Sequence, residues 1–132
     1  MKYMILVYGS QQDYASMAGQ ATGGRPAWSA EQFAALGTFM ESFNQDLAQS
    51  GELVDTRGLT APVHARRIQL RNGVPVVTDG PLAEAKEHFG GYLIVDCESV
   101  GRATEIALRW PNARFAAMEV RPIMNADGGQ DT

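Results

Sequence analysis

An Asn-Gly pair, Asn72-Gly73, stands between two runs of residues typical of β-strands, and it constrains the fold more than any other feature of this chain. Both central positions of a two-residue hairpin turn need a positive φ, which asparagine and glycine adopt most easily. The pattern therefore predicts a β-hairpin over residues 65–78. The turn also sets the register, and continuing it by one residue places Arg66 opposite Asp79 on one face of the hairpin.

The first helix is predicted by signals at both of its ends and by a regular apolar stripe. Ser29 and Gln32 form a capping box, and Gly51 is well placed to end the helix in the left-handed conformation. Large apolar side chains recur between these ends at steps of three and four, which predicts that they all face the core. The members of this stripe are Phe33, Leu36, Met40, Phe43 and Leu47.

The order of the remaining elements indicates the fold class. Ser99 caps a second helix, and apolar runs predict strands near residues 2–8, 52–56, 91–97 and 114–122. This order predicts an α+β fold: a ferredoxin-like antiparallel sheet with two helices on one face and an inserted β-hairpin. The second face of the sheet would be bare. We therefore expect a homodimer that packs open sheet face on open sheet face, as in a dimeric α+β barrel.

Length and composition exclude several classes of protein. A chain of 132 residues fits one domain, expected over residues 1–123 with a flexible C-terminal tail at residues 124–132. The net charge of −4 disfavours a nucleic-acid partner. A single cysteine, Cys97, excludes an internal disulfide and predicts a small buried side chain. No apolar run reaches the ~20 residues of a membrane span, so we expect no membrane partner and a cytoplasmic location.

Ionisable side chains are concentrated just after the hairpin, in residues 77–92. If Arg66 faces Asp79, it keeps that carboxylate ionised by lowering its pKa. A fixed carboxylate beside a cation at the mouth of a cavity can abstract or relay a proton. The predicted catalytic residues are Asp79, Arg66, Lys86 and Glu84.

Each of these residues also has a purely structural interpretation. An aspartate before Gly80-Pro81 commonly holds a turn by binding backbone N–H groups. Its pair with Arg66 would then be a cross-strand ion pair worth roughly 0.2–1 kcal/mol. The acidic and basic residues that follow the turn would form a solvated rim. The sequence leaves the two interpretations open.

Further polar and aromatic residues are candidates for binding a ligand. Arg121 either clamps an anion or bonds across a dimer, while the aromatic candidates equally suit core or interface packing. The histidines either reach a ligand or lie plainly on the surface. No residues have the spacing of metal ligands, so we expect no metal and no cofactor. The predicted ligand-binding residues are His88, Arg121, Tyr8 and Trp28, and His64 is given the surface interpretation.

Several short motifs together resemble the DGPF domain of the YCII-related family, over nearly the whole chain except the early loop and the tail. They are Thr78-Asp79-Gly80-Pro81 with Glu84, Lys86-Glu87 and Gly90-Gly91-Tyr92, Met1-Lys2-Tyr3-Met4, Ser50-Gly51-Glu52-Leu53 and Glu119-Val120-Arg121-Pro122-Ile123. The resemblance implies a dimeric α+β barrel. It is compatible with a cofactor-free isomerase or lyase that transfers protons on a small metabolite. The alternative that it implies is a non-catalytic ligand-binding or regulatory module, linked to transcription.

The chain departs from the family pattern at two places. Leu82 stands where the family name has phenylalanine, which keeps an apolar anchor. The wider YCII group resembles enzymes with a His-Asp pair whose histidine lies near the start of the first long helix. Residues 26–29 hold no histidine here, so that pair is not carried over to this chain.

Overall fold

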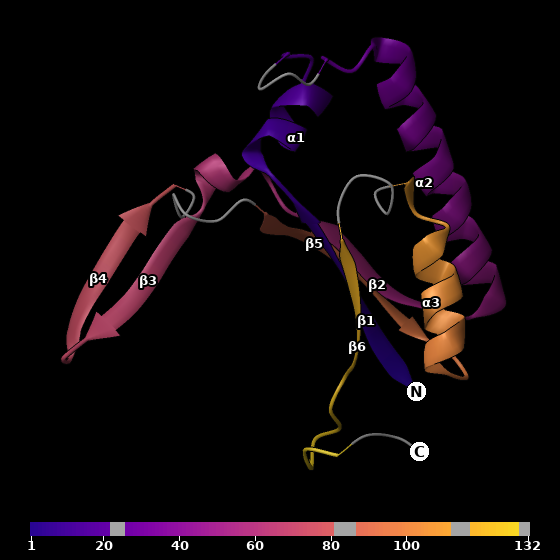
Figure 1. Ribbon diagram of the computed structural model, residues 1–132. Helices are drawn as coiled ribbons and strands as arrows, with labels where there is room; N and C mark the ends of the chain where they lie inside the picture. Colours follow the sequence, from indigo (N-terminus) through magenta and orange to yellow (C-terminus); the bar gives the residue numbers. More distant parts are fainter. Residues whose placement is uncertain (22–25, 81–86, 112–116, 130–132) are drawn as a thin grey trace.

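The computed structural model describes residues 1–21, 26–80, 87–111 and 117–129 of the chain (Figure 1). The elements follow one another as β1 (Lys2–Gly9), α1 (Gln11–Met17), α2 (Ala30–Ser50), β2 (Leu53–Gly58), the 3-10 turn η1 (Pro62–His64), β3 (Arg66–Arg71), β4 (Val74–Asp79), β5 (His88–Asp96), α3 (Val100–Leu108) and β6 (Met118–Pro122).

Four of these strands form one antiparallel sheet in the order β2-β5-β1-β6. Ile5 at the centre of β1 lies between Leu93 of β5 and Val120 of β6. Helices α2 and α3 lie on the same side of this sheet (Figure 1). Strands β3 and β4 form a separate two-stranded sheet inserted before β5. The predicted α+β, ferredoxin-like arrangement with an inserted hairpin is confirmed.

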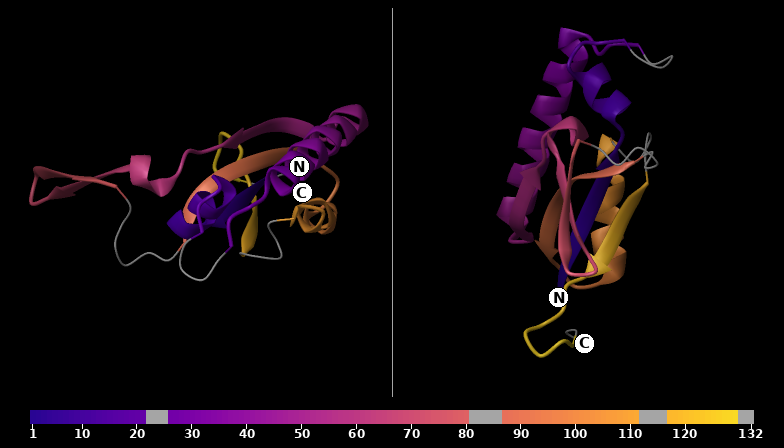
Figure 2. Two further views of the ribbon diagram at one scale, coloured as in Figure 1. Left: turned by 90° about the horizontal axis from the view of Figure 1, so that it is seen from above. Right: turned by 90° about the vertical axis from the view of Figure 1, so that its left-hand side faces the viewer.

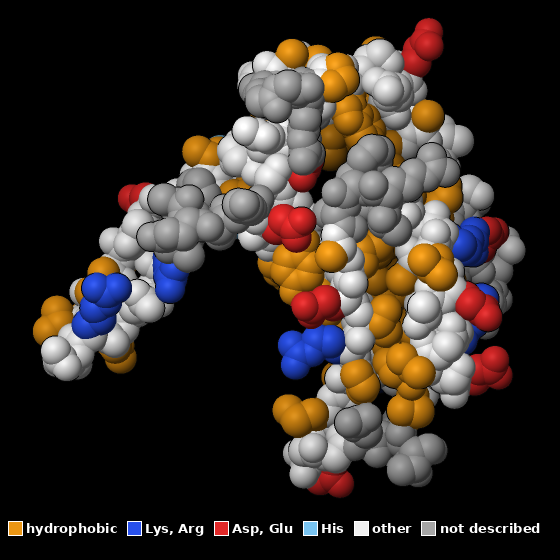
Figure 3. Space-filling model, in the orientation of Figure 1, with side chains coloured by type: hydrophobic (Ala, Val, Ile, Leu, Met, Phe, Trp, Pro, Cys, Tyr) orange, Lys and Arg blue, Asp and Glu red, His pale blue; other side chains and the backbone are white. Residues whose placement is uncertain are grey.

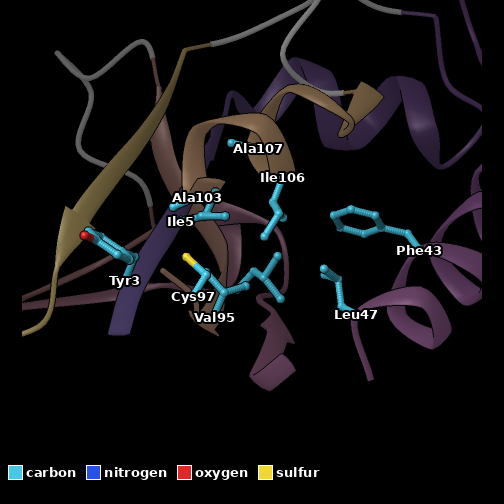
Figure 4. Close-up of a cluster of buried hydrophobic side chains, with 10 residues drawn as sticks. Tyr3, Ile5, Phe43, Leu47, Val95, Cys97, Ala103, Ile106 and Ala107 are labelled. Carbon is cyan, nitrogen blue, oxygen red and sulfur yellow. The ribbon is translucent and has the colours of Figure 1, made fainter. Parts of the chain in front are cut away.

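The core lies between the sheet and the helix layer (Figure 4). Alternate residues of a strand point to opposite faces, so Tyr3 and Ile5 of β1 turn toward the helices. Cys97 is buried in the same cluster, as predicted. The core side chains are Tyr3, Ile5, Phe43, Leu47, Leu93, Val95, Cys97, Ala103, Ile106 and Ala107.

Helix α2 has the predicted ends but only part of the predicted buried stripe. Ser29 and Gln32 form the capping box, and Gly51 ends the helix with φ of 79°. Phe43 and Leu47 are buried, whereas Phe33 is 55% exposed. The expectation that Phe33 belongs to the core is wrong, because the N-terminal half of α2 extends beyond the edge of the sheet (Figure 1).

Two strand boundaries differ from the sequence-based expectation. Strand β5 begins at His88, three residues before the predicted start, so the glycine pair Gly90-Gly91 lies inside the strand. Strand β6 is described from Met118 to Pro122, while residues 112–116 lie outside the described part of the chain.

Helix α1 is short, and side-chain hydrogen bonds fasten it to the end of the sheet. Ser10 and Asp13 form a capping box at its start. The Tyr14 hydroxyl lies 3.1 Å from the Leu59 carbonyl oxygen and 3.3 Å from that of Gly90. The Gln11 side chain accepts a hydrogen bond from the backbone N–H of Val63. Helix α1 therefore braces the segment that leads from β2 into the hairpin.

Within the described residues, no helix combines the length and the apolar character needed to cross a membrane.

Candidate functional site

The hairpin has the register that the Asn-Gly turn predicts. Asn72 and Gly73 both adopt positive φ, of 51° and 78°. Arg66 pairs with Asp79 across the two strands, and the Arg66 Nε donates to the Asp79 Oδ1 over 3.0 Å. The local sequence alone was enough to place these two side chains together.

This ion pair is open to solvent in the single chain. The Arg66 side chain is 67% exposed and that of Asp79 is 79% exposed. Water screens such a pair, so its contribution to stability is at most about 1 kcal/mol. The pair is fixed by the turn, but none of the described residues of the same chain shields it from water.

A concavity of about 370 Å³ lies at the base of the hairpin, just before β3 begins. Both histidines of the chain line it, although they are 24 positions apart in the sequence. Arg66 and Asp79 do not line it themselves. Its lining residues are Leu59, Thr60, Ala61, Pro62, His64, Ala65, His88 and Phe89.

The concavity and the Asp79 turn are joined through one backbone hydrogen bond. The N–H of Gly80 donates to the carbonyl oxygen of Ala65 over 2.8 Å. Ala65 lines the concavity and directly precedes Arg66 in the chain. Arg66 therefore directly follows a wall residue in the chain, while the side chains of Arg66 and Asp79 do not line the concavity.

Backbone hydrogen bonds hold the two histidines in place. His64 ends the turn η1, in which the N–H of Ala65 donates to the Pro62 carbonyl oxygen. His88 opens β5 and lies opposite Gly9 of β1. Two segments distant in sequence thus meet because β5 returns to the sheet beside the end of β2. His88 is half-buried and His64 is exposed.

At both positions of the glycine pair in β5, a larger residue would collide with a neighbouring atom. A Cβ at Gly90 would lie 2.8 Å from the Tyr14 hydroxyl oxygen. A Cβ at Gly91 would lie 2.7 Å from the backbone oxygen of Arg57 in β2. These two glycines allow α1 and β2 to approach β5 closely, next to the wall of the concavity.

Another group of polar residues lies on the face of the sheet that points away from the helices. We call this face the open face. The Tyr8 hydroxyl lies close to the Glu119 carboxylate. Burial, followed by the charge and hydrogen bond of Glu119, raises the pKa of the Tyr8 phenol, while Arg121 acts to lower it. The Tyr8 ring also meets Phe89 edge to face, with 6.2 Å between centroids.

Apolar side chains occupy the middle of the open face. Met4 and Leu6 of β1 alternate with the core residues, and Ile94 and Tyr92 of β5 lie opposite them. The Tyr92 hydroxyl donates to Asp55 Oδ2 over 2.9 Å, and this bond raises the pKa of Tyr92. Figure 3 shows apolar side chains along the sheet with acidic and basic side chains beside them.

The remaining predicted site residues lie elsewhere. Trp28 is half-buried, and its backbone N–H donates to the carbonyl oxygen of Ser16 in α1. Neither Trp28 nor Tyr8 lines the concavity.

Glu84 and Lys86 lie outside the described residues. Among the residues that are described, no three His, Cys, Asp or Glu side chains cluster in a way that could hold a metal ion.

Sequence reasoning missed three residues that shape these sites. His64 is exposed, as predicted, but nothing local shows that it shares a concavity with His88. Glu119 was not selected, although its alternation with Val120 in a strand places it on the polar side. Tyr14 was overlooked, although the Ser10–Asp13 capping box signals the helix that carries it.

Comparison with known proteins identifies the family. An uncharacterised protein of Rhizobium meliloti (strain 1021) is 29% identical over 99 residues, which cover 74% of this chain and 80% of that protein. Residues 1–127 match the family described as the YCII-related domain. This match extends over both the sheet and the hairpin, and the chain belongs to the YCII-related domain family.

Proposed function

We propose that this protein binds a small oxygenated metabolite in the concavity at the base of the hairpin and transfers a proton on it without a cofactor, as an isomerase or lyase does. The observation that carries the proposal is the convergence of His64 and His88 in one concavity. Histidine is the side chain that most readily exchanges protons near neutral pH. Two imidazoles in one site can act as the base and the acid of a proton shift.

The lining suits a small, partly polar molecule. The volume of the concavity, about 370 Å³, falls within the ordinary range of ligand sites, about 300–1,000 Å³. Leu59, Pro62 and Phe89 supply apolar wall, and Thr60 supplies a hydroxyl group. The guanidinium of Arg66, which follows the wall residue Ala65 in the chain, would attract the carboxylate of a substrate such as a 2-oxo acid.

The Asp79 turn is assigned a supporting role in this proposal. Asp79 pairs with the Arg66 guanidinium at 3.0 Å and would orient it toward a ligand in the neighbouring concavity. Glu84 and Lys86 follow the turn in sequence and are proposed to act on the same ligand. The Asp79-Gly80-Pro81 motif also supports placing the chain in the DGPF branch of the family.

We further propose that the protein is a homodimer joined through the open face. Met4, Leu6, Tyr92 and Ile94 give this face an apolar centre, and a second copy would remove it from water. In that dimer Arg121 and Tyr8 lie at or near the interface, either bonding across it or binding a ligand there. Ile94→Asp places a charge at the centre of the face, so it should convert the dimer to a monomer in sedimentation experiments.

A binding module without catalysis is the second candidate. The exposure of His64 and of the Arg66–Asp79 pair favours it, since catalytic sites usually exclude water. Such a module would hold the same ligand and report it to a partner, for example in transcription. The net charge of −4 is compatible with a protein partner rather than direct contact with nucleic acid.

Two measurements on one set of variants separate these functions. Imidazole resonances in ¹⁵N NMR report binding of small 2-oxo acids such as pyruvate, and ²H uptake at the carbon next to the carbonyl reports proton transfer. We expect both signals in the wild type and the loss of ²H uptake in His88→Gln and His64→Gln. The control is Arg109→Gln, whose side chain pairs with Asp46 in the helix layer.

The outcomes differ for each hypothesis. Binding without ²H uptake in the wild type would refute the enzyme and leave the binding module. Equal ²H uptake in the wild type and both histidine variants would refute the assigned roles of the histidines. If neither binding nor uptake occurs with any oxo acid tested, the concavity is not the site.

A further inference from the structure

The turn η1, which carries His64 in the wall of the concavity, cannot cap its own first N–H group. Its first residue is Pro62, which has no N–H, so Val63 holds the first backbone donor of the turn. A serine, threonine, aspartate or asparagine before a helical turn usually accepts such an N–H with its side-chain oxygen. Ala61 stands in that place and has no side-chain oxygen, so a protein acceptor has to come from another segment.

Helix α1 supplies this acceptor through Gln11. Figures 1 and 2 show α1 beside η1 at the end of the sheet. The Gln11 Oε1 accepts the N–H of Val63 over 3.0 Å, although 52 positions separate the two residues in the chain. Val63 lies between Pro62 and His64, and both of these line the concavity. Gln11 therefore acts as a long-range N-cap of the turn that carries His64.

Tyr14 contacts the other end of the same wall segment. It follows Gln11 by three positions, which places both side chains on one face of α1. The Tyr14 hydroxyl lies 3.1 Å from the carbonyl oxygen of Leu59, where the wall segment begins. One face of α1 thus holds this segment at its start and again directly before His64.

The same helix is joined to the strand that carries His88. Gly9, the last residue of β1, pairs with His88 at the start of β5. Ser10 follows Gly9 and caps α1 by accepting the N–H of Asp13 over 3.1 Å. A helix of seven residues thus links the backbone beside His88 to the backbone beside His64. Its length and its caps therefore help to set the separation of the two imidazoles.

We propose that Gln11 is a positioning residue: by capping η1 from α1, it holds the His64 imidazole at a fixed place relative to His88. Gln11 does not line the concavity, so it acts through His64. The consequence for proton transfer rests on the function proposed above. An acid and a base must both reach one substrate, and a misplacement of about 1 Å costs about 100-fold in rate. Loss of the cap should therefore impair catalysis without removing any group that touches the substrate.

Water-exchange NMR on the ligand-free protein tests the cap directly. Gln11→Leu removes the acceptor oxygen and Gln11→Glu keeps one, while Gln12→Leu is the matched control on an exposed residue of the same helix. The net worth of one hydrogen bond corresponds to a change of about three- to tenfold in a local opening equilibrium. We expect Gln11→Leu to speed exchange of the Val63 amide by about this factor, and the other two variants to leave it within about twofold. Equal exchange rates in Gln11→Leu and the wild type would overturn the proposal.

The ¹⁵N resonances of the two imidazoles show whether the cap acts on His64. We expect Gln11→Leu to shift or broaden the His64 resonances and to leave those of His88 in place. Gln12→Leu should leave both histidines as they are in the wild type. His64 resonances that do not change in Gln11→Leu, or that change equally in Gln12→Leu, would overturn the proposal.

Proton transfer is measured as ²H uptake into pyruvate. At saturating pyruvate we expect Gln11→Leu to lower kcat about tenfold or more with KM within about threefold, and Gln11→Glu to recover most of the rate. Uptake at the wild-type rate in Gln11→Leu would overturn the positioning role. If the wild type itself takes up no ²H with any oxo acid tested, the proposed function fails. The Val63 exchange and the His64 resonances then still decide whether Gln11 positions His64.

Discussion

Replacing Gly91 with alanine should destabilise the protein through a collision between two strand backbones. The new Cβ would lie 2.7 Å from the Arg57 carbonyl oxygen and 3.2 Å from the Gly58 Cα. Ordinary contacts begin at 3.4 Å, so the closer pair overlaps by about 0.7 Å. Gly58 and Gly91 are paired residues of β2 and β5, so the overlap is relieved only by moving a strand.

The expected cost follows from this geometry. Overpacking of this kind costs about 1–3 kcal/mol, and the φ of 158° at Gly91 strains an alanine by more than the smaller entropy of the unfolded chain gains. For a chain of 132 residues each kcal/mol corresponds to about 4 °C in Tm. We therefore expect Gly91→Ala to lower Tm by about 4–12 °C in a thermal unfolding experiment followed by circular dichroism.

Two other glycines supply controls for this experiment. Gly37 lies inside α2, and no atom lies within 4 Å of the position that a Cβ would take there, so Gly37→Ala should raise stability by about 0.5–1 kcal/mol. At Gly90 the colliding atom is the Tyr14 hydroxyl, and without it the nearest ring carbon is 3.8 Å away. Gly90→Ala should therefore cost less in a Tyr14→Phe background. A Tm for Gly91→Ala within about 1 °C of the wild type would refute the close approach of β2 and β5.

Three further predictions concern single ionisable groups. The Arg102 hydrogen bonds lower the pKa of Glu52, so their stabilisation is present above about pH 4.5 and is lost as the pH falls through the folded-state pKa. Urea unfolding should show Glu52→Gln to be less stable by about 1–3 kcal/mol at pH 7, with the gap closing in acid. Burial raises the pKa of Cys97, so its thiol should react with Ellman's reagent at pH 8 only after unfolding. Asp79→Asn should cost less than about 1 kcal/mol, because its pair with Arg66 is exposed; a larger loss would mean that the pair is shielded in the native assembly.

Local sequence signals predicted those features that depend on neighbouring residues. The Asn72-Gly73 turn fixed the hairpin register, because its dihedral angles admit few residue types. Ser29 and Gly51 marked the ends of α2, because capping is a contact over three or four residues. The apolar stripe of that helix was less informative. Periodicity shows which side chains share a face, but not how far the sheet beneath them extends, and Phe33 is exposed for that reason.

The sequence by itself thus determined the order of elements, the fold class and the meeting of Arg66 with Asp79, since each follows from short-range stereochemistry. Only the tertiary structure decided that His64 and His88 line one concavity and that Tyr8 and Glu119 meet on the open face. It also decided that the hairpin leaves the sheet with its apolar face uncovered. The physical reason is that contacts between distant segments depend on how β5 pairs with β1 and β2, and no local pattern encodes that pairing.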